Sequence, residues 1–248
     1  MILQVISGLF ISYILLFILS IIIKDNSIAD IFWGLGFLQV TIHSFYLSGT
    51  SELSQILFNV LIMIWSLRIS LYIFSKKLVK KGEDPRYAAW RNEWKHFYVR
   101  SFFQVFMLQG VLLLIISLPI FLINISPPPV GIMSGLGIAI ASFGLIYETI
   151  ADLQLRSFIQ TKKKGGIMTK GLWRYSRHPN YFGESVFWLG ASIIASQVSL
   201  FTFVSWVLIT VLLRFVSGVP LAEARYKDNT QYQIYKKNTP PMFPRLFK

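Results

Sequence analysis

The chain has 248 residues, of which 54% are hydrophobic and 14% are charged, and its formal net charge is +13. A soluble domain has about a quarter charged residues, so this composition excludes an ordinary water-soluble fold and favours a membrane protein with several spans. The sequence contains no cysteine, which excludes disulfides, thiolate metal sites and cysteine nucleophiles. The first apolar run lacks a basic leader and a cleavage site, so we expect it to be a retained span.

Seven apolar segments predict an all-α integral membrane fold. Most are close to the ~20 residues that a helix needs to cross a bilayer. The sixth is short, so it either forms a hairpin with the seventh, turning near Ser196 and Gln197, or continues into it as one long bent helix. The predicted helices cover residues 2–23, 29–48, 54–75, 101–124, 130–155, 183–197 and 199–216.

The basic residues alternate along the chain. They lie in the first, third and fifth connections and in the C-terminal tail, whereas the second, fourth and sixth connections contain none. Basic loops stay in the cytoplasm, so this pattern predicts seven spans with the N-terminus outside and the C-terminus in the cytoplasm. Membrane orientation also explains most of the positive charge, which disfavours nucleic acid as a partner.

Ionisable residues near the predicted span ends are candidates for function, because a charge inside a span costs roughly 2.5–3.5 kcal/mol on insertion scales. Glu148, Asp152 and Arg156 are spaced by four residues and therefore share one helix face. Two interpretations remain open. Asp152 and Arg156 form an ion pair within the helix, or the face lines a polar cleft.

A polar stretch, Gly171-Leu-Trp-Arg-Tyr-Ser-Arg-His-Pro-Asn-Tyr-Phe-Gly-Glu184, precedes the sixth segment. The start of a helix presents free N–H groups, and arginines beside them are typical of anion sites. Glu184 suits either such a site or the helix dipole. The C-terminal tail contains a similar combination of acidic, basic and tyrosine side chains, although its tyrosines also suit a membrane interface. Its polar residues are Glu223, Arg225, Tyr226, Tyr232, Tyr235 and Lys236.

Several familiar sites are absent from the sequence. His43, His96 and His178 lack the spacing of metal ligands, so we expect no metal. No glycine-rich dinucleotide motif follows a strand, so a dinucleotide would bind without a Rossmann fold.

The stretch Gly171–Glu184, with Asp152-Leu-Gln-Leu-Arg156 before it, closely resembles the C-terminal region of the steroid 5-alpha-reductase family. Nearly the whole chain is similar to a bacterial branch of that family, which is grouped as a domain of unknown function. The superfamily also contains sterol C14-reductases and isoprenylcysteine carboxyl methyltransferases. Further matching segments are Asp30–Gly34, Gly82–Tyr87, Ser217–Pro220 and Tyr232–Lys236.

The resemblance implies a seven-span reductase that binds NADPH on the cytoplasmic side of a bacterial inner membrane. The implied substrate is a lipophilic enone or unsaturated lipid, whose C=C bond is reduced. It further implies one membrane domain, with substrate-side spans over about 1–100 and a cofactor-binding half over about 130–248. The implied cofactor residues are Asp152, Arg156, Tyr175, Arg177, His178, Asn180, Tyr181 and Glu184, closed by Glu223, Arg225, Tyr226 and Tyr235 of the tail.

The chain departs from the steroid reductases at the carbonyl-binding pair. Those enzymes resemble one another in placing a glutamate in the second span and a tyrosine in the third. Here Trp65 stands where the tyrosine would be, and an indole N–H is a donor but no acid. Asp30 and Arg68 are the candidate catalytic residues in their place.

Two alternatives to the reductase stay open. One is an S-adenosylmethionine-dependent methyltransferase that acts on a lipid or prenyl group, and the other is a lipid-binding membrane protein without catalytic activity. NADPH carries several phosphates, whereas S-adenosylmethionine carries none, so the arginines favour NADPH. Those arginines are Arg156, Arg174, Arg177 and Arg225.

Overall fold

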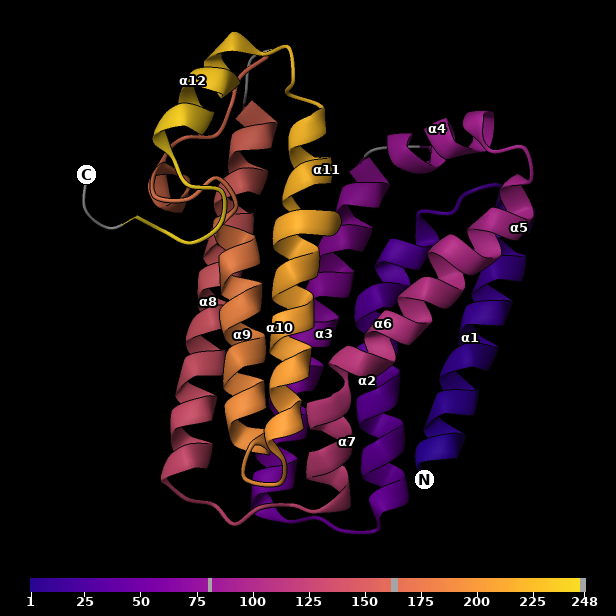
Figure 1. The fold of residues 1–248 in the computed structure, drawn as a ribbon, viewed down its shortest axis with the longest axis vertical. Coiled ribbons are helices and arrows are strands. Elements are labelled where there is room, and N and C mark those ends of the chain that lie inside the picture. Colours follow the sequence, from indigo (N-terminus) through magenta and orange to yellow (C-terminus); the bar gives the residue numbers. More distant parts are fainter. Residues whose placement is uncertain (80–81, 162–164, 246–248) are drawn as a thin grey trace. The chain divides into compact units, whose positions relative to one another are not determined.

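The computed structural model describes residues 1–79, 82–161 and 165–245, and within these ranges every regular element is a helix (Figure 1). The expected all-α fold is therefore confirmed. The chain forms two compact units, Met1–Val130 and Gly131–Lys248, named unit 1 and unit 2 below.

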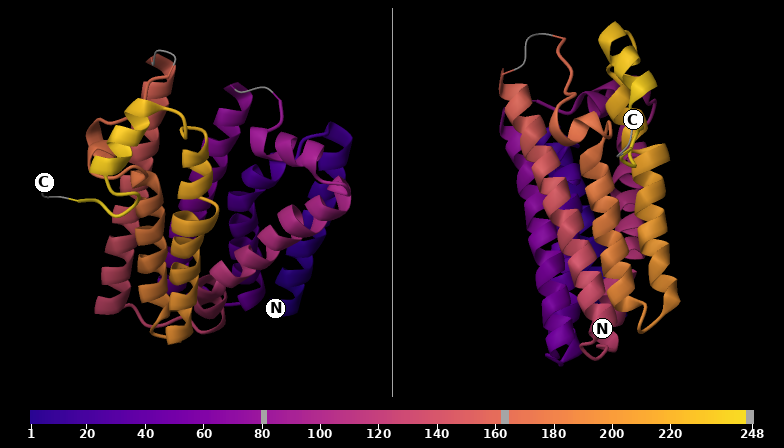
Figure 2. Two further views of the ribbon diagram at one scale, coloured as in Figure 1. Left: turned by 45° about the horizontal axis from the view of Figure 1, so that its top comes forward. Right: turned by 90° about the vertical axis from the view of Figure 1, so that its left-hand side faces the viewer.

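Unit 1 contains three long helices and a series of shorter ones. α4 lies across the end of the unit where α3 finishes (Figures 1 and 2). The elements are α1 (Ile2–Ile23), α2 (Ile28–Ser48), α3 (Leu53–Val79), α4 (Pro85–Glu93), α5 (Phe97–Ser101), the π-helical η1 (Phe102–Met107), α6 (Leu108–Ile116) and α7 (Leu118–Ile125).

Close helix packing in unit 1 depends on a glycine of α2. A Cβ atom at Gly34 would lie 2.3 Å from Ser70 Oγ and 2.6 Å from the carbonyl oxygen of Ser66. Only glycine therefore lets α2 approach α3 this closely, as is usual between membrane helices. One turn further along α2, the ring of Phe37 meets the ring of Trp65 edge-on, with centroids 5.3 Å apart.

A buried amide network joins α2, α3 and α7 near the other end of unit 1. Asn124 Oδ1 accepts hydrogen bonds from Gln55 Nε2 at 2.9 Å and from Asn59 Nδ2 at 2.8 Å. Asn124 Nδ2 donates to Ser44 Oγ at 2.9 Å. Polar side chains shared between helices in this way hold apolar bundles together.

Unit 2 places α9 between α8 and α10, with the tail folded at the end where α8 finishes and α9 begins (Figures 1 and 2). Its elements are α8 (Ile132–Thr161), η2 (Gly171–Arg174), α9 (Pro179–Ala195), η3 (Leu200–Thr202), α10 (Phe203–Val211), the π-helical η4 (Leu212–Val216), α11 (Val219–Ala224) and α12 (Thr230–Asn238).

α8 and α9 pack through backbone contact at glycines. A Cβ atom at Gly144 would lie 2.4 Å from Phe187 N, and one at Gly183 would lie 2.6 Å from Glu148 N. Gly137 and Gly190 are equally close to the opposite helix. This row of glycines aligns the end of α8 with the start of α9, where the predicted cofactor residues lie.

The hairpin alternative for the last two predicted segments is correct. α9 ends at Ala195, and α10 returns antiparallel to it (Figure 1). Ser192 and Thr202 close the turn, because each hydroxyl donates to the other residue's carbonyl oxygen, at 3.0 and 3.1 Å. Further along the pair, Ser185 Oγ and Thr210 Oγ1 lie 2.7 Å apart.

Six helices of the described ranges are long and apolar enough to cross a membrane. The chain therefore has the helices of a membrane protein. α9 has 17 residues and is not among the six, so the seven-span topology remains a prediction. The six candidate spans are Ile2–Ile23, Ile28–Ser48, Leu53–Val79, Phe97–Ile116, Ile132–Thr161 and Leu200–Ala224.

Candidate functional site

The end of α8 meets the start of α9 at a carboxylate and an amide. Asn180 Nδ2 donates to Asp152 Oδ1 at 3.2 Å. This bond fixes the orientation of the amide, because the carboxylate can only accept. Asn180 Oδ1 is consequently turned away from Asp152; it is buried and has no hydrogen-bond partner in the described part of the chain. Such a buried acceptor calls for a donor from outside the described residues.

The α8 face that carries Glu148, Asp152 and Arg156 is divided between the interior and the surface. Glu148 and Asp152 are buried, while Arg156 is exposed. The two carboxylates therefore face the interior of the helix packing and the guanidinium lies at the surface, and both interpretations of this face remain predictions. Glu184, one turn beyond Asn180 on α9, is also buried.

Three positively charged or titratable side chains converge on Glu223 in α11. Arg177 Nε donates to Glu223 Oε1 at 2.7 Å, and His178 Nε2 lies 3.2 Å from the same oxygen. Lys236 Nζ of α12 lies 3.0 Å from Glu223 Oε2. Arg177, His178 and Glu223 are buried, so the contacts among these three are shielded from water, whereas the Lys236 side chain is 48% exposed.

His178 has an environment that favours its neutral form. Burial lowers the pKa of His178, Glu223 raises it, and the guanidinium groups of Arg177 and Arg225 lower it again, so that the pKa lies below its ordinary value. The imidazole stacks on Tyr181, with centroids 5.1 Å apart and planes inclined by 6°.

The tail returns over the loop that precedes α9. Tyr235 donates its hydroxyl proton to the carbonyl oxygens of Trp173 and Ser176, the second at 3.2 Å. Burial is the main reason that the pKa of Tyr235 is raised above its ordinary value, so the phenol remains a donor. A second tyrosine pair, Tyr226 and Tyr232, is stacked with centroids 4.6 Å apart.

Five arginines of unit 2 have no carboxylate partner within residues 131–161 and 165–245. Arg156, Arg174, Arg225 and Arg245 are exposed, and Arg214 is half-buried. Guanidinium groups that no carboxylate neutralises are available to an anion. Three of them lie near the ring of the following residue: Arg174 by Tyr175 at 6.0 Å, Arg214 by Phe215 at 4.7 Å and Arg225 by Tyr226 at 4.9 Å.

The two predicted catalytic residues lie in unit 1, and Asp30 is already engaged there. Arg86 Nη2 donates to Asp30 Oδ2 and the Tyr87 hydroxyl donates to Asp30 Oδ1, both at 2.6 Å. Burial, followed by the negative charge of Asp30, raises the pKa of Tyr87 well above its ordinary value. Arg68 is half-buried on α3, with its guanidinium carbon 6.0 Å from the ring centroid of Tyr72.

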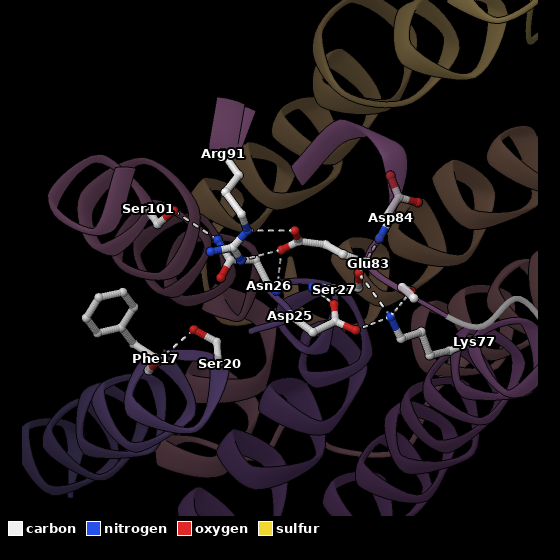
Figure 3. Close-up of polar contacts among 11 residues, drawn as sticks. Phe17, Ser20, Asp25, Asn26, Ser27, Lys77, Glu83, Asp84, Arg91 and Ser101 are labelled. Atoms are coloured by element: carbon white, nitrogen blue, oxygen red, sulfur yellow. Dashed lines mark hydrogen bonds and ion pairs between the residues drawn. The ribbon is translucent and has the colours of Figure 1, made fainter. Parts of the chain in front are cut away.

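A second set of ion pairs surrounds the connection between α1 and α2 (Figure 3). Arg91 donates to both carboxylate oxygens of Glu83, at 2.9 and 2.8 Å, and Glu83 accepts from Asn26 N at 2.9 Å. Lys77 pairs with Asp25. Burial raises the pKa of Asp25, but its hydrogen bonds with Lys77 and Ser27 outweigh this effect and lower the pKa overall.

Sequence reasoning missed the partners that occupy these side chains. Tyr87 and Arg86 belong to a segment singled out only by resemblance, and nothing in their spacing indicates Asp30 as their acceptor. Lys236 likewise meets Glu223 only because α12 folds back. The one available signal is the Pro240-Pro241 pair, which predicts an extended chain after α12.

Comparison with known proteins assigns the chain to a family without assigning an activity. A family model described as "Protein of unknown function (DUF1295)" matches residues 16–239, and the chain belongs to this family. No curated protein matches the sequence.

Proposed function

We propose that this member of the family is a membrane-embedded, NADPH-dependent reductase of a C=C bond in a lipophilic enone or unsaturated lipid. The observation that carries the proposal is the open acceptor Oδ1 of Asn180, whose Nδ2 donates to Asp152. The same end of unit 2 bears Arg174 and Arg225, which have no carboxylate partner among the described residues. The proposal includes the link to the steroid reductase superfamily that the motif at Gly171–Glu184 suggests.

The residues present fit the chemical groups of NADPH. Two neighbouring acceptors, the Asp152 carboxylate and Asn180 Oδ1, suit N–H or O–H donors such as a carboxamide, an amino group or a ribose hydroxyl, and they repel phosphate. Phosphates instead suit the exposed arginines Arg174 and Arg225.

The bound cofactor would supply a hydride for the β carbon of the substrate. The protein's own task is to hold the substrate and to stabilise the negative charge that develops on its carbonyl oxygen. In this proposal Arg68 offers a permanently charged donor to that oxygen. Asp30, held by Arg86 and Tyr87, is the second candidate.

The proposed topology has seven spans, with α9 as the short one, the N-terminus outside and the C-terminus in the cytoplasm. The alternation of basic and uncharged connections supports it. A bacterial inner membrane remains the proposed location, and the substrate and membrane lipid the proposed partners.

Thermal unfolding of the purified protein in detergent tests the proposed cofactor. We expect NADPH to raise the Tm, because a ligand that binds only the folded state stabilises it. Asn180→Leu should weaken NADPH binding by about 5- to 150-fold, since a buried donor of the ligand left without its acceptor costs about 1–3 kcal/mol. Gln160→Leu, which changes an exposed amide on the same unit, serves as the matched control and should leave the affinity unchanged.

The same measurement separates the other functions. Protection by S-adenosylmethionine without protection by NADPH would replace the reductase with a methyltransferase. No shift with either compound would favour a lipid-binding protein without catalytic activity.

A further inference from the structure

Arg177 is the residue of the polar stretch whose donors are most completely used inside the protein. Its Nε atom donates to Glu223, and its Nη1 atom donates to two carbonyl oxygens of the tail, those of Lys236 at 2.9 Å and Thr239 at 2.6 Å. The side chain is only 7% exposed. An anion could reach these donors only by displacing Glu223 or the tail.

The tail segment that Arg177 binds runs back along the loop before α9, and we name residues 239–245 the strap. The N–H of Arg177 donates to the carbonyl oxygen of Pro240 at 2.9 Å, and the N–H of Arg245 donates to that of Tyr175 at 3.1 Å. Ser176 Oγ donates to the carbonyl oxygen of Met242 at 2.7 Å, and the Met242 side chain is fully buried. The strap is thus built into unit 2.

Glu223 gives this arrangement its charge balance. Its two oxygens face Arg177 and Lys236, with His178 beside the first. The cations stand on two different elements, the loop before α9 and α12, whereas the carboxylate stands on α11. Glu223 therefore joins the loop before α9 to both helices of the tail, α11 and α12.

We propose that Arg177 is a positioning residue that locks the strap onto the loop 171–178, and that it does not itself bind the cofactor. Arg174 and Tyr175 lie in the locked loop and are exposed. By holding this loop in one conformation, Arg177 presents Arg174 to an anion. That Arg174 then binds the cofactor rests on the proposed function above. The contact by which Arg177 holds the strap on the loop, named the lock below, does not.

Hydrogen exchange measures the contact between the strap and the loop 171–178 directly. The amide of Arg177 in the loop donates to the strap, and the amide of Arg245 in the strap donates to the loop. Arg177→Lys retains the charge beside Glu223 but lacks the planar fork that reaches two carbonyl oxygens. We expect peptides containing these amides to exchange at least 10-fold faster in Arg177→Lys. Arg174→Lys, the matched change at an exposed position of the same loop, should leave their exchange as in the wild type.

NADPH affinity, measured on the same variants, distinguishes positioning from contact. Arg177→Lys should weaken NADPH binding at least 10-fold together with the faster exchange. Weaker binding with unchanged exchange at Arg177 and Arg245 would mean that Arg177 contacts the cofactor, and would overturn the proposal. Faster exchange in a protein whose wild type binds no NADPH would support the lock and refute the proposed function.

A second variant covers the case in which Arg177→Lys does not fold. Glu223→Gln keeps the shape of the side chain but removes the charge that holds Arg177. Exchange at both amides should again be faster, with helical content unchanged by circular dichroism. Wild-type exchange in Glu223→Gln would refute the lock.

Discussion

Individual polar side chains at the start of α9 carry different tasks, although they stand together in the sequence. Asn180 keeps an acceptor open, Arg177 directs its Nε and Nη1 donors to protein groups, and Arg174 is exposed without a carboxylate partner in the described ranges. A guanidinium binds a phosphate only with donors that the fold has not already used. Arg177 is therefore a less suitable phosphate ligand than Arg174.

The titration of His178 leads to a prediction at this scale. Because its pKa is lower in the folded protein than in the unfolded chain, the unfolded chain binds more protons below about pH 6.5. The stability that this shift contributes should therefore decline as the pH falls below about 6.5. We expect the difference in Tm between the wild type and His178→Gln to narrow as the pH is lowered through this value. A difference in Tm that stays constant with pH would contradict a lowered pKa of His178 in the folded protein.

Among the elements, the pairing of α8 with α9 is the most demanding. Gly144→Ala places a methyl group 2.4 Å from Phe187 N, where backbone and not a flexible side chain must move. Overpacking of this kind costs about 1–3 kcal/mol. We expect a lower Tm, by roughly 2–4 °C for each kcal/mol, in thermal unfolding.

Gly135→Ala is the matched control on the same helix. No heavy atom of the described residues lies within 4 Å of the added methyl group, apart from the chain neighbours and the helix's own backbone. Alanine favours helix over glycine by about 0.5–1 kcal/mol, so this variant should be neutral or slightly more stable. Equal destabilisation by both substitutions would show that the α8–α9 contact is looser than the structure indicates.

The ends of the elements follow local rules where the sequence supplies them. α9 begins at Pro179, since proline suits the first turn of a helix. α4 begins after Asp84, whose side chain accepts from the N–H of Arg86 at 3.0 Å. The sequence allows two alternatives for the connection between α9 and α10, because the contact between Ser192 and Thr202 that closes the hairpin has no local signal.

For the whole molecule, the distribution of basic residues makes a testable statement about orientation. We expect a reporter fused after the C-terminal residue to be active in the cytoplasm, and one fused before Met1 to be active outside, because basic connections remain inside. An odd number of spans requires α9 to cross. If both reporters were active on the same side of the membrane, the number of spans would be even, and α9 would not cross the membrane.

The amino-acid sequence by itself determined that this chain is helical and apolar enough for membrane spans, because these properties depend on composition and local periodicity. It also indicated that Asp152, Asn180 and the residues around Arg177 belong to one end of the fold. Tertiary structure alone decided which of their donors and acceptors remain open. The return of the tail places carbonyl oxygens and Glu223 against Arg177, and such contacts between distant segments leave no periodic or local signal in the sequence.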